Sequence, residues 1–459
     1  MGLIAKLPEV IEEAKKEYEC TEGSSFILEE ELGTSKNLIA LGDNAGFMKH
    51  LLDGGEGVES LRGRIQQIYI DPPFFSKANY DAVIKLQSPD GETAVKHKAY
   101  EDVWKEGMAE YLKMLGTRLF LMHDLLADDG TIWVHLDWHG VHYVKVLMDE
   151  IFGEKNFVNE IIWTYKSGGS SKKHFARKHD TILVYSKTDK YYLKLPKEKS
   201  YNRGFKPYRF KGVEEFQDEL GWYTMVNMKD VWSIDMVGRT SAERTGYATQ
   251  KPEALLERIV AAGSREGDIC ADFFCGSGTL GSAAGKLGRR WICCDDGPLA
   301  VAAAMKRLSR QGENMQVIRR EGFYGQAAEL EADAYYSPTL FNDKINFTIE
   351  LKSYKLKEPE TIVRAAEENP LAPIDFWSVD LDYDGKVFRP EPGASFYRDE
   401  KGLRTEMTLE IPAKGAARRR IAVRTVDILG NISYVIIDGG KIFEQKKKKK
   451  NHKHSCRYN

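Results

Sequence analysis

The amino-acid sequence predicts an α/β fold of the doubly wound, Rossmann-like kind, followed by a smaller β-rich unit. Buried strands alternate with amphipathic helices through the first two thirds of the chain, which is typical of a mostly parallel sheet covered by helices. A complete strand–turn–helix–strand unit occupies residues 268–295. Beyond residue 336 the helical periodicity gives way to β-rich runs, which predicts a separate C-terminal unit.

The composition is typical of a soluble globular protein. The chain has 459 residues, of which 42% are hydrophobic and 30% charged, and its formal net charge is −2, so an overall polybasic signature is absent. No apolar run is long enough to cross a membrane, and the first residues do not resemble a secretion signal, so we expect a cytoplasmic location. Six cysteines without a CxxC pair indicate neither a disulfide framework nor a zinc ribbon.

Individual elements follow from the spacing of apolar residues. Helices are expected over residues 8–19, from about 100 to 126, from about 140 to 152, for about ten residues after Pro252, and up to residue 287. Strands are expected over residues 37–44, 65–70, 131–135, 290–295, 344–351 and 422–437. The last of these runs is expected to turn at Gly430-Asn431, because this dipeptide lies between two apolar stretches.

A local basic cluster compensates for the neutral overall charge. Residues 165–211 hold 14 Lys or Arg against 3 acids, interleaved with aromatic side chains. Basic side chains neutralise phosphates and planar rings stack on bases, so we expect nucleic-acid contact, with a solvated surface as the alternative. The candidate DNA-binding residues are Lys172, Lys173, Arg177, Lys178, Arg203, Lys206 and Arg209.

The 268–295 unit carries a candidate nucleoside site. Gly276 and Gly278 follow the strand that ends at Asp272, and glycines at such a turn let the backbone approach a ligand closely. Asp295, at the end of the next strand, is placed to accept hydrogen bonds from ribose hydroxyls. The third glycine of a dinucleotide motif and the lysine of a phosphate loop are both missing, so NAD and ATP fit less well. A packing turn is the alternative.

A second motif, Asp71-Pro72-Pro73-Phe74, follows a predicted buried strand. Two prolines remove two amide donors and leave the Asp71 carboxylate and the Pro72 carbonyl as acceptors. Such a site suits an incoming NH2 group, while Phe74 stacks on the ring that carries it. A rigid surface turn is the alternative.

Taken together, these residues resemble the beta class of DNA amino-methyltransferases, in which the acceptor motif precedes the target-recognition region and the cofactor motif comes last. The order here is Asp71–Phe74, the basic aromatic segment, and then Asp272–Gly278. The resemblance extends to residues 42–44, 125–130, 179–185 and 249–258, and it covers about residues 35–310. The C-terminal extension suggests relatives among the modification subunits of type III restriction systems.

The resemblance implies a Rossmann-like methyltransferase fold with circularly permuted motifs, and S-adenosylmethionine as the cofactor. It divides the chain into a catalytic domain (1–335, with target recognition at about 164–245), a β-sandwich-like domain (336–443) and a disordered basic tail (444–459). Asp71, Pro72, Pro73 and Phe74 would form the catalytic motif. The implied cofactor-binding residues are Asp43, Thr249, Lys251, Asp272, Phe273, Gly276, Gly278 and Asp295.

The reaction implied by the resemblance is methyl transfer to the N6 amino group of adenine in double-stranded DNA. An Asp at the first acceptor position is usual for adenine N6, whereas Ser is usual for cytosine N4, which stays open as an alternative. An RNA methyltransferase and a noncatalytic DNA-binding relative are further alternatives. A restriction subunit and a second copy of the chain are candidate partners, and no membrane partner is expected.

The run His135-Leu-Asp137-Trp-His139 looks like a metal-ligand set, because alternate residues share one face of an extended strand. The strand end would border the base pocket in the resembling family without a metal. We therefore expect no metal here, and hydrogen bonding or DNA contact instead.

Overall fold

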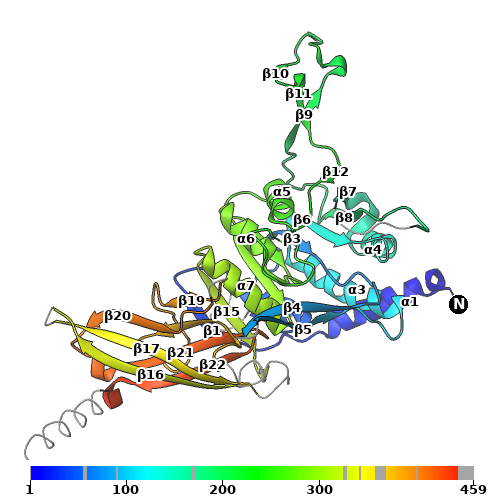
Figure 1. The fold of residues 1–459 in the computed structure, drawn as a ribbon. Helices are drawn as coiled ribbons and strands as arrows, with labels where there is room; N and C mark the ends of the chain where they lie inside the picture. Colours follow the sequence, from blue (N-terminus) through cyan, green and yellow to red (C-terminus); the bar gives the residue numbers. More distant parts are fainter. Residues whose placement is uncertain are drawn as a thin grey trace, which may run out of the picture.

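The structure is a computed structural model that describes residues 2–54, 59–88, 91–166, 172–238, 240–323, 328–340, 343–356, 369–399 and 402–442. A ten-stranded sheet runs through the larger part of the chain, with strand order β1-β15-β2-β14-β13-β3-β6-β8-β7-β12 (Figure 1). Its strands are β1 (Phe26–Leu32), β2 (Leu38–Leu41), β3 (Ile65–Ile70), β6 (Leu126–Leu136), β7 (Phe157–Thr164), β8 (His179–Ser186), β12 (Val231–Ser233), β13 (Ile269–Asp272), β14 (Arg290–Asp295) and β15 (Met315–Arg320).

Helices cover both faces of this sheet, which confirms the predicted doubly wound class. The helices are α1 (Leu3–Cys20), α2 (Asn44–Asp53), α3 (Met108–Leu125), α4 (Val141–Met148), α5 (Glu253–Gly263), α6 (Thr279–Lys286) and α7 (Pro298–Arg310). Apolar residues of α2, α3 and α4 belong to one hydrophobic core, and those of α5, α6 and α7 belong to the other. On β14, Ile292 and Cys294 pack into the first core, while Trp291 and Cys293 pack into the second. Burial on both faces explains why these strands read as continuous apolar runs.

The parallel strands bring distant motifs to one edge of the sheet. β13 pairs in parallel with both β14 and β3, and β14 pairs in parallel with β2. The chain leaves β13 towards α6 on one face and leaves β3 towards α3 on the other, so the strand order reverses between β13 and β3. Ligands of open α/β sheets bind outside the carboxyl ends of the strands at such a switch point.

The predicted start of the third helix, at about residue 100, was wrong. Residues up to Glu101 form an antiparallel hairpin of β4 (Asn79–Ser88) and β5 (Gly91–Glu101), and α3 begins only at Met108. Gly107, with φ +79°, precedes the helix in a conformation that other residues rarely adopt. The apolar spacing was therefore helical only beyond that glycine.

Three further sheets lie outside the ten-stranded sheet and the β4–β5 hairpin. The first joins β9 (Lys197–Tyr201), β10 (Phe216–Asp218) and β11 (Gly221–Asn227), and it extends away from the body in Figure 1. The C-terminal unit has a sheet β16-β17-β20 and a sheet β19-β18-β21-β22, which enclose a third hydrophobic core. Its strands are β16 (Glu329–Pro338), β17 (Lys344–Lys355), β18 (Ile374–Asp380), β19 (Ser395–Tyr397), β20 (Glu406–Pro412), β21 (Arg420–Asp427) and β22 (Ile432–Asp438).

The expected turn at Gly430 is confirmed, because β21 and β22 form a hairpin around it. The expected boundary at residue 336 falls inside β16, which starts at Glu329. Ala and Glu, which are poor strand formers, fill the first half of β16 and concealed it in the sequence. The predicted tail, residues 444–459, lies outside the described residues, and its disorder stays a prediction.

The C-terminal unit is fixed to β1 and α7. The backbones of Glu29 and Glu31 exchange hydrogen bonds with Phe388, both 2.9 Å long. Between them Glu30, which is 1% exposed, forms a buried ion pair with Arg424 of β21. A Cβ at Gly430 would lie 2.3 Å from the Pro298 carbonyl oxygen, so the hairpin turn meets the start of α7 at backbone distance.

Arg424→Leu is expected to lower the free energy of unfolding by about 3–5 kcal/mol, because Glu30 would stay buried without its cation. Arg389→Leu is the matched control, since Arg389 pairs with Glu31 at the same interface but is 48% exposed, and it should cost at most about 1 kcal/mol. Urea unfolding measures both losses. Equal losses in the two variants would contradict the role given to the buried pair.

Candidate active site

The acceptor motif begins where β3 ends, at the switch point of the sheet. Lys251 forms an ion pair with Oδ2 of Asp71, and only 9% of this lysine is exposed. The other carboxylate oxygen, Oδ1, is buried and has no hydrogen-bond partner among the described residues. No donor from the described part of the chain reaches the Pro72 carbonyl oxygen either. Two acceptors therefore lie side by side in sequence with their hydrogen-bonding capacity free, as the motif predicted.

Lys251 was expected in the cofactor pocket, and the structure places its ammonium group on the Asp71 carboxylate. The ammonium nitrogen also lies 5.2 Å from the centre of the Phe74 ring. Gln250 holds the preceding loop, because its side-chain oxygen accepts hydrogen bonds from the Thr245 backbone N–H (2.8 Å) and hydroxyl (2.9 Å). The lysine thus fixes one oxygen of Asp71 and leaves the other available.

Asp102 holds the loop after the acceptor motif in a strained conformation. Its buried carboxylate accepts hydrogen bonds from the backbone of Phe75 (3.0 Å) and Ser76 (2.6 Å) and from the Trp104 indole (2.9 Å). Phe75 has φ +67°, which is costly for an aromatic residue and needs such support. Sequence reasoning missed Asp102, because a lone acid after an unrecognised hairpin carries no motif.

The His135, Asp137 and His139 side chains, which looked like a metal-ligand set in the sequence, are engaged in two separate groups of hydrogen bonds. The buried His135 ring makes hydrogen bonds with the Tyr69 hydroxyl (2.8 Å) and the Asp180 carboxylate (3.2 Å), and it packs 5.8 Å from the Phe74 ring. His139 instead bonds to Asp137 at 2.7 Å. Within the described part of the chain, no three His, Cys, Asp or Glu side chains are grouped to hold a metal.

Asp180 is a charged support behind Phe74. Burial opposes ionisation of its carboxyl, but hydrogen bonding to His135, the charge of Lys251 and a hydrogen bond from Tyr165 lower its pKa. The Tyr165 bond is 3.1 Å long. His135, Tyr165 and Asp180 were not among the predicted site residues, and their supporting role depends on contacts between β6, β7 and β8 that the sequence does not display.

The turn after β13 contains two glycines in left-handed backbone conformations, closely packed against neighbouring side chains. Gly276 and Gly278 adopt φ +48° and +70°, which favour glycine. A Cβ at Gly278 would lie 2.8 Å from Ala304 Cβ, and one at Gly276 would lie 3.2 Å from the Tyr247 ring. The Gly276 N–H donates to Asp295 Oδ2 at 2.9 Å, so the turn and the end of β14 are fixed to each other.

Two carboxylates face this turn, the buried Asp272 and the half-buried Asp295, and neither has a direct cation partner among the described ion pairs. Burial raises the pKa of Asp272 well above its usual value, and the nearby Asp71 adds to the rise. Burial, and then the neighbouring Asp296, raises the pKa of Asp295 to about 7. S-adenosylmethionine fits such a site, because it brings a positive sulfonium and ribose hydroxyls that donate hydrogen bonds.

Asp43 and Thr249 lie at the borders of this region. Asp43 caps α2 by accepting the Gly46 N–H at 2.8 Å, and it pairs with Arg118 at 3.1 Å. It keeps 41% of its side chain exposed, so it can also meet a ligand. Thr249 is exposed with φ +59°, and its hydroxyl lies 3.5 Å from the Tyr100 hydroxyl of the β4–β5 hairpin.

Phe273 is fully buried in the first core, which favours a packing role over a direct ligand contact.

The predicted DNA-binding residues fall into two groups. The first lies in the exposed segment 172–178 that leads into β8, where the Arg177 guanidinium stacks 3.9 Å from the centre of the Trp138 ring. The second group, Arg203, Lys206 and Arg209, lies on the projecting β9–β11 sheet and its loops. The sheet also exposes Phe205 and Phe210, by 54% and 63%.

Comparison with known proteins identifies the class. Residues 65–306 match the family model described as DNA methylase, the N6/N4 methyltransferases, and this match covers more than half of the chain. The chain therefore belongs to this family, and it is an S-adenosylmethionine-dependent DNA methyltransferase. None of the helices in the described residues is both long and apolar enough to span a membrane.

Three curated relatives illustrate the breadth of the family. The type II methyltransferase M.EcaI of Enterobacter cloacae is 29% identical over 62% of this chain and 72% of its own length. The DNA adenine methyltransferase YhdJ of Escherichia coli is 25% identical over 53% of this chain and 76% of its own length. The Mod subunit of the type III restriction-modification enzyme EcoP15I of Escherichia coli is 26% identical over 35% of this chain and 25% of its own length. The first five relatives are covered over 60% to 76% of their own lengths.

If Asp295 accepts the ribose hydroxyls, as the family resemblance implies, cofactor affinity is expected to rise as the pH increases from about 6 to 8, because the ionised carboxylate is the better acceptor and the pKa of Asp295 is about 7. Binding should therefore release a proton near neutral pH. Calorimetric titrations in two buffers of different protonation enthalpy measure both effects, and Asp295→Asn should abolish the pH dependence. An unchanged pH profile in that variant would assign the titration to another group.

Proposed function

We propose that this chain methylates the N6 amino group of adenine in double-stranded DNA, using a base flipped out of the helix. The observation that carries the proposal is the Asp71 carboxylate, which has one oxygen held by Lys251 and the other buried without a partner. A buried acceptor without a partner costs free energy in the resting protein. An amino group that donates to it removes that cost at the moment of binding.

The two acceptors act on the same amino group. Asp71 Oδ1 accepts one N–H of the base amine and the Pro72 carbonyl accepts the other, which favours a pyramidal nitrogen with its lone pair directed outward. Phe74 stacks on the base, and Pro73 fixes the backbone between the two groups. The ion pair with Lys251 holds Asp71 in place, so the acceptor does not have to reorganise as the amine becomes positively charged.

When bound, S-adenosylmethionine supplies an electrophilic methyl group on a positively charged sulfur. We propose that the turn with Gly276 and Gly278 admits its methionine part, that Asp295 accepts its ribose hydroxyls and that Asp43 lies at its adenine edge. Thr249 lies at the rim of the pocket and Asp272 lines it from within, while Phe273 packs behind it in the first core. The contribution of the protein is mainly positioning and electrostatics.

The preference for adenine N6 over cytosine N4 rests on the acid at the start of the acceptor motif and on the adenine specificity named for the YhdJ relative. The family contains both kinds of enzyme, so cytosine N4 is the alternative product. An RNA substrate and a protein that binds DNA without catalysis are the other outcomes that the experiment below distinguishes.

We further propose that the chain acts within restriction–modification. The names of M.EcaI and the EcoP15I Mod subunit support this setting for relatives, and a restriction subunit or a second copy of this chain would be the corresponding partner. The projecting β9–β11 sheet, with its exposed Phe205 and Phe210, fits a role in target recognition. The division into catalytic, recognition and C-terminal units is part of the same proposal.

Asp71→Ala is expected to reduce methyl transfer by about 10²–10³-fold or more, while cofactor affinity stays within about twofold, because the acceptor oxygen is lost and the cofactor contacts remain. The measurement is single-molecule sequencing of DNA from a methylation-free host that expresses either form. N6-methyladenine at one sequence motif, lost in the variant, supports the proposal.

Asp128→Ala, which removes a carboxylate that is 90% exposed, is the control and should methylate normally. Methylcytosine at the motif would establish the alternative product. Undiminished methylation by Asp71→Ala would overturn the role of the carboxylate, and cofactor binding without any DNA modification would point to an RNA substrate or a missing partner.

Replacing the four basic residues of segment 172–178 by alanine is expected to weaken duplex binding and to flatten its salt dependence. If all four contact phosphates, the slope of log affinity against log salt concentration should change by up to about 3.6. Fluorescence anisotropy with a labelled duplex measures the slope. The substituted residues are Lys172, Lys173, Arg177 and Lys178.

The matched control removes the same charge from a distant part of the chain, by substituting the exposed lysines Lys6, Lys15, Lys16 and Lys36. This variant should retain the original slope. Equal slopes for the two variants would exclude specific phosphate contacts by the 172–178 segment.

A further inference from the structure

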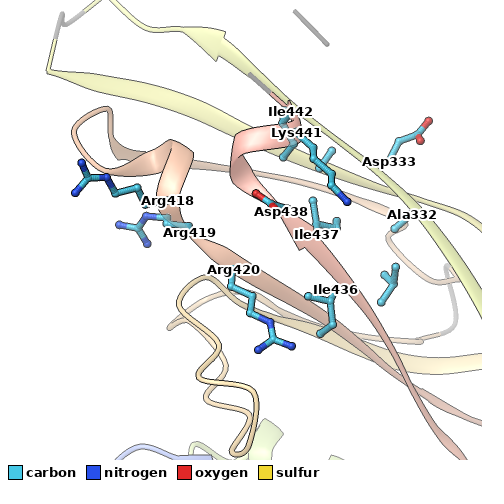
Figure 2. A pocket seen from close by; sticks show the side chains of 12 residues that line it. Ala332, Asp333, Arg418, Arg419, Arg420, Ile436, Ile437, Asp438, Lys441 and Ile442 are labelled. Carbon is cyan, nitrogen blue, oxygen red and sulfur yellow. The ribbon is translucent and has the colours of Figure 1, made fainter. Parts of the chain in front are cut away.

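The C-terminal sandwich carries a groove that the methylation site does not use. The groove has a volume of about 540 Å³ and lies between β16 and β22, which are edge strands of the two sheets and contact each other. Figure 2 shows Arg418, Arg419 and Arg420 along one side and Lys441 on the side nearer to Ala332. Three consecutive arginines and a lysine around one groove are unusual for a surface that only closes a hydrophobic core.

Most of this positive charge is uncompensated. Arg418, Arg420 and Lys441 are exposed, and among the described residues none of them forms an ion pair or a side-chain hydrogen bond. Arg420 lies 5.5 Å from the centre of the Tyr383 ring, which orients its guanidinium without neutralising it. Arg419 is the exception, because it bonds to Asp382 at 2.9 Å.

The two carboxylates of the groove are already engaged. Asp333 lies 3.7 Å from the Lys352 ammonium, and Asp438 accepts the Gly440 N–H at 2.8 Å. The sequence adds further positive charge, since five consecutive lysines, residues 446–450, begin four positions beyond Ile442. Ile442 itself lines the groove.

We propose that this groove binds the phosphate backbone of DNA, as a second contact surface for the duplex that the enzyme methylates. Guanidinium groups match phosphate oxygens in a bidentate way, and unpaired cations release counterions from a polyanion when it binds. The inference rests on the proposed function, because it assumes that the same DNA serves as substrate. A peptide added to the edge strands is the competing occupant, but a peptide does not explain three unpaired cations.

The position of the groove determines what it does. The C-terminal unit is attached at β1, one edge of the ten-stranded sheet, whereas the projecting recognition sheet leaves near β7 and β12 at the other edge (Figure 1). Ten strands span roughly 43 Å, which corresponds to about 13 base pairs of B-form DNA. The groove therefore contacts flanking phosphates, and it contributes to affinity without touching the reacting base.

The test uses the full chain with Arg418, Arg420 and Lys441 replaced by alanine and a labelled 40-base-pair duplex of random sequence. The affinity at about 0.15 M salt is expected to fall by about 10-fold, and the salt slope by up to about 2.7. At saturating DNA the methylation rate should be unchanged, because the acceptor site is intact. Thermal unfolding checks that the exposed substitutions leave the fold intact.

The control variant replaces three exposed lysines of the same unit that do not line the groove: Lys344, Lys355 and Lys386. It should bind the duplex like the original chain. Equal affinities for the groove variant and the original would overturn the proposal and favour a peptide in the groove. Because anisotropy needs no methyl transfer, failure of the methylation reaction and failure of the groove proposal are read out separately.

Discussion

The site depends on how the two oxygens of one carboxylate are used. Lys251 neutralises Oδ2 of Asp71, while Oδ1 is buried and has no partner in the described part of the chain. A carboxylate with both oxygens hydrogen-bonded would offer nothing to a substrate, and a buried carboxylate without any cation partner would be costly. The ion pair therefore offsets the cost of burial at one oxygen, and the prolines, which lack N–H groups, leave the other oxygen free. The strained loop, the Asp102 anchor and the His135–Asp180 support all hold this arrangement in place.

The fold makes the arrangement possible by bringing remote segments together. Asp71 and Lys251 are 180 residues apart, and they meet because β3 and β13 are parallel neighbours at the switch point of the sheet. Asp295 is the last residue of β14, and Asp43 follows β2, on the same edge. The order of motifs along the chain is therefore free to vary, since only the neighbourhood of the strands in the sheet matters. This is the physical basis of a permuted motif order.

Much of the framework was predictable because it follows from local chemistry. Strands β3 and β14 were expected at their observed bounds, since a sheet covered on both faces makes each strand continuously apolar. The glycine turn was recognisable because positive φ angles favour glycine. The β4–β5 hairpin and the supports Asp102 and Asp180 were not, since their roles arise from tertiary contacts with no sequence periodicity. The ion pair of Lys251 with Asp71 was not foreseen either, because a spacing motif does not show where a long side chain ends.

The central claim is that Asp71 Oδ1 receives the amino group of the target base. Once the methylated position is mapped, binding can be compared for duplexes that carry adenine or purine, which lacks the 6-amino group, at that position. With the original chain, loss of the amino group should weaken binding by about 1–3 kcal/mol, and with Asp71→Ala it should have little effect. The same loss in both proteins would show that the amino group does not contact Asp71, and it would contradict the account.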